Sequence, residues 1–280
     1  MKHRSIIVSF YIFLLSLDSI NPQIYCFEEK KFFFQNYIND SDFIAHKIFW
    51  SIDNYFLILD KEIGSVYKFN SSYNRNKKIK NYNISEKFGK IVGIVSNSSG
   101  TKIIDQSNNQ IFILDNDLNL LSIDILDLEI YPNVAAIDLW GKINLYSKRL
   151  NGIFLYEKDI ENRALINFDQ IPKFGNCVLD IEISTNGSIG VLDCDGEVYI
   201  FNMFGKFQYS YSLSIKNPRF ILPYKDNWLV FQENGIGINI NNRTNVYLPE
   251  TKLRLKDITF RGNKIAALYD SYILVSKIDD

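Results

Sequence analysis

Histidine is nearly absent from this chain of 280 residues, which contains only His3 and His46. A histidine-rich zinc site needs several imidazole ligands, and a serine or cysteine nucleophile needs a histidine as its base. His3 belongs to an N-terminal segment that has the layout of a leader, so His46 is the single histidine of the remaining sequence. A lone histidine is more often a surface or loop residue than a ligand or base. The sequence therefore argues against both kinds of catalytic centre.

An excess of positive charge is also missing, because 31 Lys and Arg residues stand against 32 Asp and Glu residues, for a formal net charge of -1. Proteins that bind nucleic acid through its phosphates carry a basic patch. The sequence also lacks a phosphate-binding glycine loop, a dinucleotide fingerprint, a CxxC pair and an EF-hand loop. We therefore expect no nucleic-acid partner and no cofactor, apart from the calcium ion considered below.

Long hydrophobic runs are confined to the N-terminus, where the basic letters KHR precede a mostly apolar run over residues 5–17. This layout is typical of a secretory signal, and the run is too short to span a bilayer comfortably, with a short membrane anchor as the alternative. We assign residues 1–26 to a signal peptide. Cleavage there leaves an exported protein without a transmembrane helix, in the periplasm, cell envelope or extracellular space. A lipidated Cys26 is a further alternative, which the bulky Tyr25 disfavours.

Cysteine is scarce as well, with three residues in the chain. After cleavage only Cys177 and Cys194 remain, and an even number of cysteines in an exported protein favours a disulfide. The turn TNG predicts a hairpin in which Ser184 pairs with Ser188 or Gly187. That register places the two cysteines close to each other across the hairpin, within the distance that a disulfide bridges. Two buried free thiols are the alternative.

Short apolar runs separated by turns of Gly, Asn and Asp make up most of the remaining chain. In residues 178–213, four predicted strands rich in Val, Ile, Tyr and Phe are separated by the turns TNG, DG and MFGK. The pattern occurs six times, and the third strands end near Phe69, Leu114, Tyr156, Phe201, Ile240 and Val275, at steps of 45, 42, 45, 39 and 35 residues. A period of about 40–45 residues with four short strands per copy is typical of propeller blades.

The repeat predicts an all-β fold, a six-bladed β-propeller with four-stranded blades, as a single domain over residues 27–280. The sixth copy stops at Asp280 after three strands, and the segment KFFFQNYI at residues 31–38 reads as a strand without a partner of its own. We expect this N-terminal strand to supply the fourth strand of the last blade. It would close the ring and hide two sheet edges.

The unit GVLDCDGEVYIFNMFGKF has a strand that ends in Asp, a short turn, and a strand that runs into Phe-Asn and a glycine turn. In these features it resembles the NHL-type six-bladed β-propeller repeat. Asp60, Asp105 and Asp193 stand where such repeats carry the strand-ending acid, whereas Ser147 and Gln232 depart from the pattern. We interpret the aspartates as turn caps. Lyases built on such propellers use histidines, which are scarce here, so the resemblance implies a fold and not their activity.

Acidic and amide side chains near the predicted innermost strands leave one catalytic alternative open. The set consists of Asn133, Asn176, Asp180, Glu182 and Asp257. Some six-bladed propellers hold Ca²⁺ on their axis with oxygen ligands of this kind, so a calcium-dependent hydrolase or lyase is one hypothesis. The competing interpretation, which we favour, is that these side chains satisfy turns or water in a polar channel.

The function that the sequence favours is an exported, non-catalytic binding or scaffolding module. In propellers, ligands usually meet the mouth where the chain runs into each innermost strand, because loops on a rigid scaffold carry function. Four of six residues at these positions are cationic, which predicts a protein or anionic-glycan partner for a monomer. The candidate binding residues are Lys47, Lys90, Asn133, Asn176, Arg219 and Lys256. The competing interpretation is that strand starts are simply polar.

Overall fold

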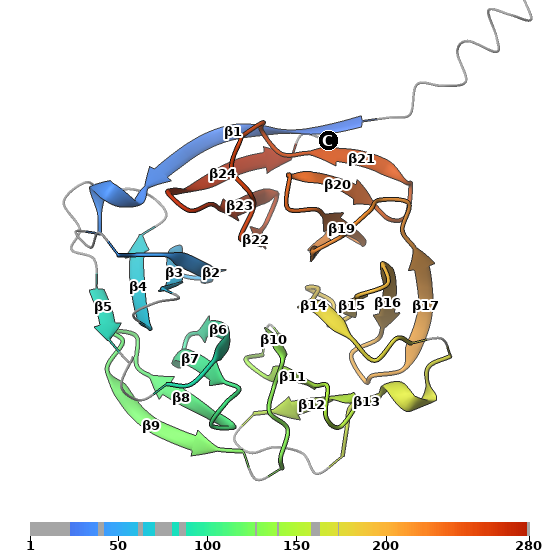
Figure 1. The fold of residues 1–280 in the computed structure, drawn as a ribbon, viewed down its shortest axis with the longest axis horizontal. Helices are drawn as coiled ribbons and strands as arrows, with labels where there is room; N and C mark the ends of the chain where they lie inside the picture. The colour runs from blue at the N-terminus through green and yellow to red at the C-terminus, as the bar shows by residue number, and fades with distance from the viewer. Residues whose placement is uncertain are drawn as a thin grey trace, which may run out of the picture.

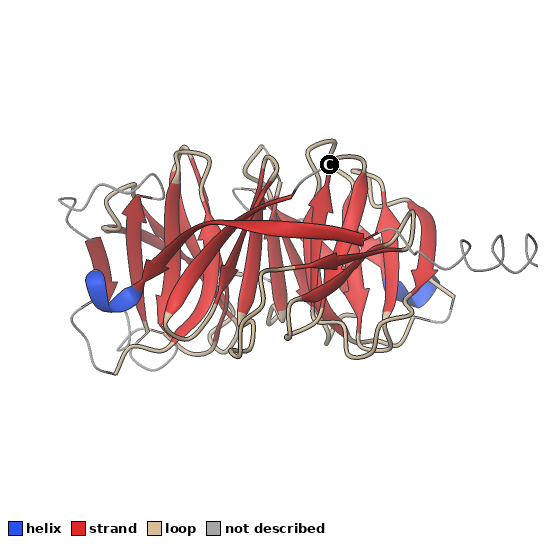
Figure 2. Cartoon of the chain, turned by 90° about the horizontal axis from the view of Figure 1, so that it is seen from above, coloured by secondary structure: helices blue, strands red, loops and turns tan. Residues whose placement is uncertain are grey.

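The computed structural model describes residues 23–38, 42–60, 64–70, 80–83, 88–126, 128–138, 140–157, 163–172 and 174–278. In this part of the chain, short strands form sheets that stand around a central axis (Figure 1). Seen from the side, the molecule is a disc whose strands run from one face to the other (Figure 2). The predicted all-β propeller fold is confirmed.

Four sheets have four strands each, and their consecutive strands are antiparallel neighbours. The first contains β2 (Ala45–Trp50), β3 (Tyr55–Asp60), β4 (Ser65–Asn70) and β5 (Lys80–Asn83). The second contains β6 (Ile91–Asn97), β7 (Gly100–Asp105), β8 (Gln110–Leu114) and β9 (Leu120–Ile125). The third contains β10 (Val134–Ile137), β11 (Ile143–Ser147), β12 (Gly152–Tyr156) and β13 (Ile166–Asn167), followed by the short 3-10 helix η2 (Phe168–Gln170). The fourth contains β14 (Val178–Ile183), β15 (Ile189–Asp193), β16 (Glu197–Phe201) and β17 (Phe207–Ser212).

The fifth sheet has eight strands in the order β18-β19-β20-β21-β1-β24-β23-β22. One half contains β18 (Phe220–Tyr224), β19 (Asn227–Phe231), β20 (Ile236–Asn239) and β21 (Thr244–Tyr247). The other half contains β22 (Asp257–Arg261), β23 (Lys264–Leu268), β24 (Tyr272–Ile278) and β1 (Gln23–Phe33).

Strand β1 joins the two halves of this sheet. Its start pairs in parallel with β21, and its remainder pairs antiparallel with β24, from Cys26 opposite Ile278 to Phe33 opposite Tyr272. The strand predicted at residues 31–38 therefore shares only its first three residues with β1, and the 3-10 helix η1 (Phe34–Asn36) follows. The run EEKK hid the true start, because an outer strand keeps polar side chains on its solvent side.

The two faces of the disc differ in which turns they carry. At one face, which we call the N face, the first strand of each group begins; these first strands are β2, β6, β10, β14, β18 and β22. The opposite face, which we call the hairpin face, carries the turns between first and second strands. This difference follows from the alternating direction of antiparallel strands.

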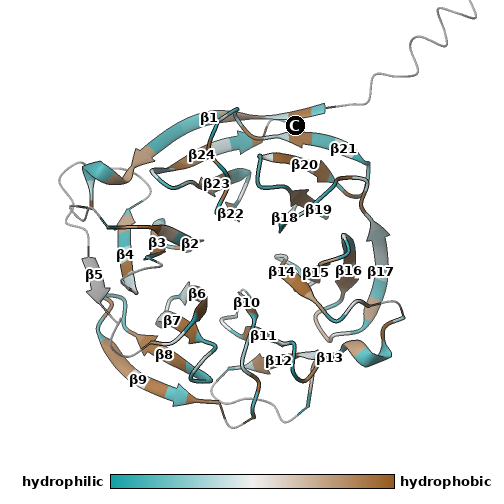
Figure 3. Cartoon of the chain, in the orientation of Figure 1, coloured by the Kyte–Doolittle hydropathy of each residue, from teal (hydrophilic) through white to brown (hydrophobic). Residues whose placement is uncertain are grey.

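Apolar side chains pack between neighbouring sheets and form the core. The second strands are the most deeply enclosed, and β11 and β15 are buried at every position. Figure 3 shows hydrophobic stretches in the strands all around the disc. Between the third and fourth sheets, the rings of Tyr146, Phe168 and Phe201 are almost inaccessible and meet edge to face. Such aromatic pairs add to the free energy gained by burying their surface.

Strand-ending aspartates tie the N face together. Asp60 Oδ2 accepts a hydrogen bond from the Ile44 amide at 3.1 Å, and Asp105 Oδ2 accepts one from the Gly89 amide at 2.9 Å. In both cases the donor lies 16 residues earlier, in the segment that leads into the first strand. The aspartates are therefore structural, as the turn-capping interpretation expects.

The two residues that depart from the acidic pattern make the same connection, but their side chains donate the hydrogen bond instead of accepting it. Ser147 Oγ donates to the Ile130 carbonyl oxygen at 2.5 Å, and Gln232 Nε2 donates to the Lys216 carbonyl oxygen. A hydroxyl or amide can donate where a carboxylate can only accept. The position therefore has one role, which two kinds of hydrogen bond fulfil.

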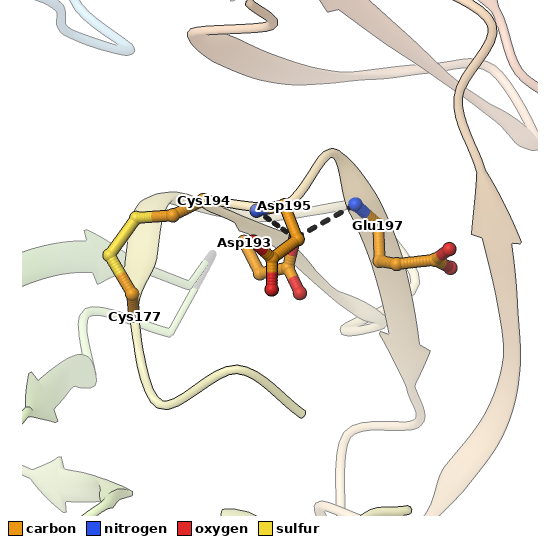
Figure 4. The surroundings of a disulfide bond; sticks show 5 residues. All are labelled: Cys177, Asp193, Cys194, Asp195 and Glu197. Carbon is orange, nitrogen blue, oxygen red and sulfur yellow. Dashed lines mark hydrogen bonds between the residues drawn. A yellow bond between two sulfur atoms is a disulfide. The ribbon is translucent and has the colours of Figure 1, made fainter. Parts of the chain in front are cut away.

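In the fourth sheet a disulfide joins Cys177 to Cys194, across 17 residues, with a Cα–Cα distance of 5.5 Å. Asp193 caps the turn next to it, accepting from the amides of Asp195 at 2.9 Å and Glu197 at 2.8 Å (Figure 4). The predicted pairing of the two cysteines is confirmed.

A β-bulge in β14 makes this pairing possible. Near the turn, Ile183 pairs with Ile189, and in that register Cys194 would lie opposite Val178. The bulge between Val178 and Asp180 adds one residue to β14, which shifts the register so that the Cys194 amide donates to the Cys177 carbonyl at 3.1 Å.

Candidate binding cavity

A cavity of about 590 Å³ lies along the axis, between the first strands of the sheets. The end toward the N face, which we call the deep end, is lined by Lys47, Asp180 and Asp257, and the cavity extends from there to the hairpin turns. There Ile52 and Trp140 line it while being 66% and 60% exposed, so the cavity reaches solvent at the hairpin face. Cavities with mostly apolar walls and a few convergent polar groups are the usual form of ligand sites.

Four charged residues meet at the deep end, and we call Lys47, Asp180, Glu182 and Asp257 the central charge cluster. Lys47 Nζ lies 3.4 Å from Asp257 Oδ1. Asp257 Oδ2 also accepts from the Ile48 amide at 2.8 Å, and Asp180 Oδ2 accepts from the Ile221 amide at 2.9 Å. Each aspartate thus joins its own first strand to that of the next group along the ring.

Burial and the closeness of the charged groups raise the pKa values of three members of this cluster, Lys47, Asp180 and Glu182. Burial raises the pKa of Asp180 to about 7, an effect that Lys47 and the Ile221 amide partly offset. Burial, together with Asp180 and Asp257, raises the pKa of Glu182 well above its usual range. Burial by itself would lower the pKa of Lys47, but Asp257 and Asp180 hold it above its ordinary value. The cluster therefore retains protons that exposed carboxyl groups would have lost.

Most of the candidate binding residues lie away from this cavity. Lys47 lines it, but the other five are not among its lining residues and lie at the N face, just before first strands; these are Lys90, Asn133, Asn176, Arg219 and Lys256. Asn133 Oδ1 accepts from the Lys148 amide at 2.9 Å, and Lys256 Nζ lies 3.0 Å from Asp270 Oδ1. Two of the six side chains are thus engaged in local structure.

Equal sequence spacing did not produce equivalent positions because the first strands are not equally spaced; β2 starts at Ala45, β6 at Ile91 and β10 at Val134. The strands β2, β6 and β14 each carry a register shift near their start. Lys47 lies beyond the bulge of β2, inside the strand, and pairs with Leu59. Arg219 and Lys256 instead stand directly before the strands β18 and β22. A bulge inserts one residue and re-aims the side chains that follow it.

The residues of the calcium hypothesis are only partly brought together. Asp180, Glu182 and Asp257 line the cavity, whereas Asn133 and Asn176 do not. Within the residues that the structure describes, no group of three or more His, Cys, Asp and Glu side chains has the arrangement of a metal site. Lys47 lies among the carboxylates, where a calcium ion would meet its charge.

Sequence reasoning missed the residues around the cavity opening at the hairpin face, which we call the rim and which include Ile52, Trp140 and Arg261. Trp140 lies beside Gly187 of the next sheet, where an added Cβ would be 3.5 Å from the indole and 2.9 Å from Met203 Cβ. Met203 and Phe204 are 44% and 76% exposed. An exposed tryptophan in a glycine turn, as in the letters LWG, is the one sequence signal that pointed to this surface.

Arg261 holds two hairpins of this rim together. Its guanidinium donates to the carbonyl oxygens of Ser51, at 2.9 Å, and Ile52, and to Asn54 Oδ1. Because these acceptors belong to the turn between β2 and β3, Arg261 joins the first sheet to β22. The rim is therefore a set of connected turns, which favours a preformed binding surface.

These features define the chain as a β-propeller, and solved structures agree. A streptogramin B lyase is 13% identical with a TM-score of 0.62, over 89% of this chain and 98% of that one. YCF48 bound to a D1 peptide is 10% identical with a TM-score of 0.59, over 87% and 81% of the two chains. BamB from Moraxella catarrhalis is 11% identical with a TM-score of 0.55, over 90% and 99%.

Likeness at this level of identity is a likeness of fold. No family model matches the chain, and no curated protein matches it. Among the described residues there is no helix with the length and apolar character that crossing a membrane requires.

Proposed function

We propose that this chain is an exported, non-catalytic β-propeller that binds a segment of a partner protein at the hairpin face. The observation that carries the proposal is the axial cavity, whose rim presents Ile52 and Trp140 to solvent. Exposed tryptophan beside a concave site is the residue type that most often dominates protein binding. Met203 and Phe204 extend the apolar surface beside it.

The N face is less suited to this role. Side chains and a disulfide tie its connecting segments to the second strands, through Asp60, Asp105, Ser147 and Gln232 and through the Cys177–Cys194 bond. Its cations include Lys256, which pairs with Asp270. A protein or anionic-glycan partner at that face therefore stays a weaker proposal than one at the hairpin face.

We infer a ring of six blades, in which the eight-stranded sheet counts as two blades joined through β1. Each half of that sheet has four strands, the number found in every other sheet. In this arrangement β1 is the outer strand of the last blade and closes the ring. The NHL-type resemblance belongs with this inference and stays a prediction.

Export is supported by the disulfide and by the leader-like sequence. Disulfides persist in oxidising compartments and are rare in the cytosol, and the bond between Cys177 and Cys194 lies partly exposed at the N face. The leader lies outside the described residues except for 23–26, which belong to β1. Cleavage after Cys26 would remove the pairing with β21, so we place the first residue of the mature protein at or before Gln23.

A displayed library of random peptides, selected on the immobilised protein, tests the binding face. We expect the selected peptides to bind at least about tenfold more weakly to Trp140→Ala, because truncating a central tryptophan commonly removes that much affinity. Lys90→Glu at the N face serves as the control and should leave binding unchanged. Selected peptides that lose affinity only for this N-face variant would place the site at the opposite mouth.

A further inference from the structure

The central charge cluster holds more negative than positive groups. Its three carboxyl groups, those of Asp180, Glu182 and Asp257, share the single cation of Lys47. The cations at the rim are engaged elsewhere: Arg261 donates to the turn between β2 and β3, and Lys225 lies 5.4 Å from the ring centre of Tyr224. Arg219 does not line the cavity, but its charge reaches Lys47, so the three carboxyl groups face two cations at this end.

Glu182 is the carboxylate that this shortage leaves uncompensated. Asp257 has Lys47 and the Ile48 amide, and Asp180 has the Ile221 amide from the neighbouring sheet. Glu182 has no ion pair in the described part of the chain, and only the nearby charge of Lys47 and the adjacent Ile183 amide stabilise its ionised form. Glu182 is half-buried, and it lines the cavity.

An uncompensated buried carboxylate is costly, and a protein relieves that cost by protonation or by binding a cation. The raised pKa values of Glu182 and Asp180 show that protonation relieves it in the free protein. The walls between this cluster and solvent are apolar and aromatic, with Trp50 and Phe260 among them. Such walls suit an aliphatic stem that ends in a charge, because the stem packs on apolar surface while its charged end finds a partner.

We propose that the cavity receives a basic side chain of the bound partner, whose ammonium or guanidinium group pairs with Glu182 at the deep end. This proposal rests on the proposed function and adds the chemical class of the ligand. The stem of the basic side chain lies along Trp50 and Phe260, and the partner backbone stays at the rim beside Trp140. The central Lys47 keeps its own bond to Asp257.

The probe for this site is a capped glycine peptide with one central lysine. A peptide with norleucine in place of lysine has nearly the same stem without the charge, and one with glutamate has the opposite charge. The tryptophan fluorescence of the protein reports binding, because Trp50 and Trp140 line the cavity. We expect the lysine peptide to bind at least about tenfold more tightly than the norleucine peptide.

Binding is also coupled to protons. A cation favours the ionised form of the carboxyl groups, so binding should release protons and should strengthen as pH rises through the range in which Asp180 and Glu182 ionise. Calorimetry of the lysine peptide in two buffers with different ionisation enthalpies measures this release. A heat independent of the buffer would contradict the role of the cluster.

Two variants with opposite expected effects complete the test. Glu182→Gln keeps the shape of the side chain and should weaken lysine-peptide binding at least about tenfold, whereas Lys47→Met removes the competing cation and should strengthen it. Glu250→Gln, an exposed carboxylate outside the cavity, is the matched control. Circular dichroism establishes that each variant is folded.

The outcomes separate this inference from the proposed function. Equal affinity for lysine and norleucine peptides, a preference for the glutamate peptide, or no effect of Glu182→Gln would each overturn the inference. If selected library peptides still depend on Trp140 in that case, the hairpin face remains the binding surface and only the basic ligand is wrong. Loss of the Trp140 dependence would overturn the proposed function itself.

Discussion

Gly190 in β15 packs closely against a neighbouring sheet. An added Cβ would lie 2.6 Å from the indole of Trp228 in β19, and that indole is only 3% exposed. The flat ring thus packs directly on the backbone of the neighbouring sheet, and only glycine leaves it room. Residue-scale contacts of this kind set how close two sheets can approach.

Gly190→Ala should destabilise the protein by about 1–3 kcal/mol, because one extra carbon in a packed core forces its neighbours to move. Denaturant unfolding measures the change. In a Trp228→Phe background the same substitution should cost less, since the smaller ring leaves space. Equal costs in the two backgrounds would mean that the indole is not the obstacle.

Asp180 makes stability depend on pH in a known direction. Its pKa rises from 3.8 to about 7 on folding, so the folded protein holds the proton more tightly than the unfolded chain. Its contribution to stability is therefore largest below the unfolded value and is lost as pH rises through about 7. Glu182, whose pKa is also raised, acts in the same direction.

The melting temperature should therefore fall as pH rises over this range, and Asp180→Asn should reduce the slope. Asparagine can still accept from the Ile221 amide but carries no proton that depends on pH. Each unit of pKa difference corresponds to about 1.4 kcal/mol, so the effect is measurable by thermal melts across pH. Asp226→Asn, in an exposed turn, is the control. An unchanged slope in Asp180→Asn would show that other groups carry the pH dependence.

At the scale of the elements, a repeated connection holds five of the six described first strands at the N face, and its chemistry varies. An aspartate accepts in the first two sheets, Ser147 and Gln232 donate in two others, and in the fourth sheet the Cys177–Cys194 disulfide takes this place. The spacing of 16 or 17 residues is common to all of these ties. The sequence pattern recognised the aspartates, but a rule based on acidity could not include a hydroxyl, an amide or a disulfide.

Replacing both cysteines, as Cys177→Ser with Cys194→Ser, should lower stability by about 3 kcal/mol at most, because the closed loop is short. Guanidinium unfolding of the oxidised protein and the double variant measures the difference. The reduced natural protein should behave like the double variant. Free thiols in the exported protein, or equal midpoints before and after reduction, would contradict the contribution assigned to this bond.

At the scale of the whole molecule, β1 connects segments from opposite ends of the chain. Phe32 of β1 is 1% exposed, and its ring centre lies 5.5 Å from that of Phe56 in β3. The strand thus supplies core as well as hydrogen bonds to the sheet that contains it. Deleting residues 23–33 would remove this core and uncover β24.

A circular permutant separates the role of this strand from its position in the chain. Joining residue 280 to Gln23 by a short turn, and opening the chain within residues 39–41, keeps the antiparallel pairing of Cys26 with Ile278. We expect the permutant to fold with nearly the natural melting temperature, whereas the deletion variant should be insoluble or strongly destabilised, since a buried phenylalanine alone contributes about 3–5 kcal/mol. A deletion variant as stable as the natural protein would contradict this role for β1.

The sequence by itself determined the all-β propeller, most strand positions and the pairing of Cys177 with Cys194. These features are local or periodic, because alternating apolar residues and glycine turns specify hairpins within each repeat. Only the tertiary structure decided which side chains meet on the axis. Lys47 and Asp257 lie 210 residues apart in the chain and contact each other only once the sheets surround a common cavity. Bulges near the starts of β2, β6 and β14 shift which residues face that cavity, and a bulge depends on how two strands pair and not on the spacing of residue types.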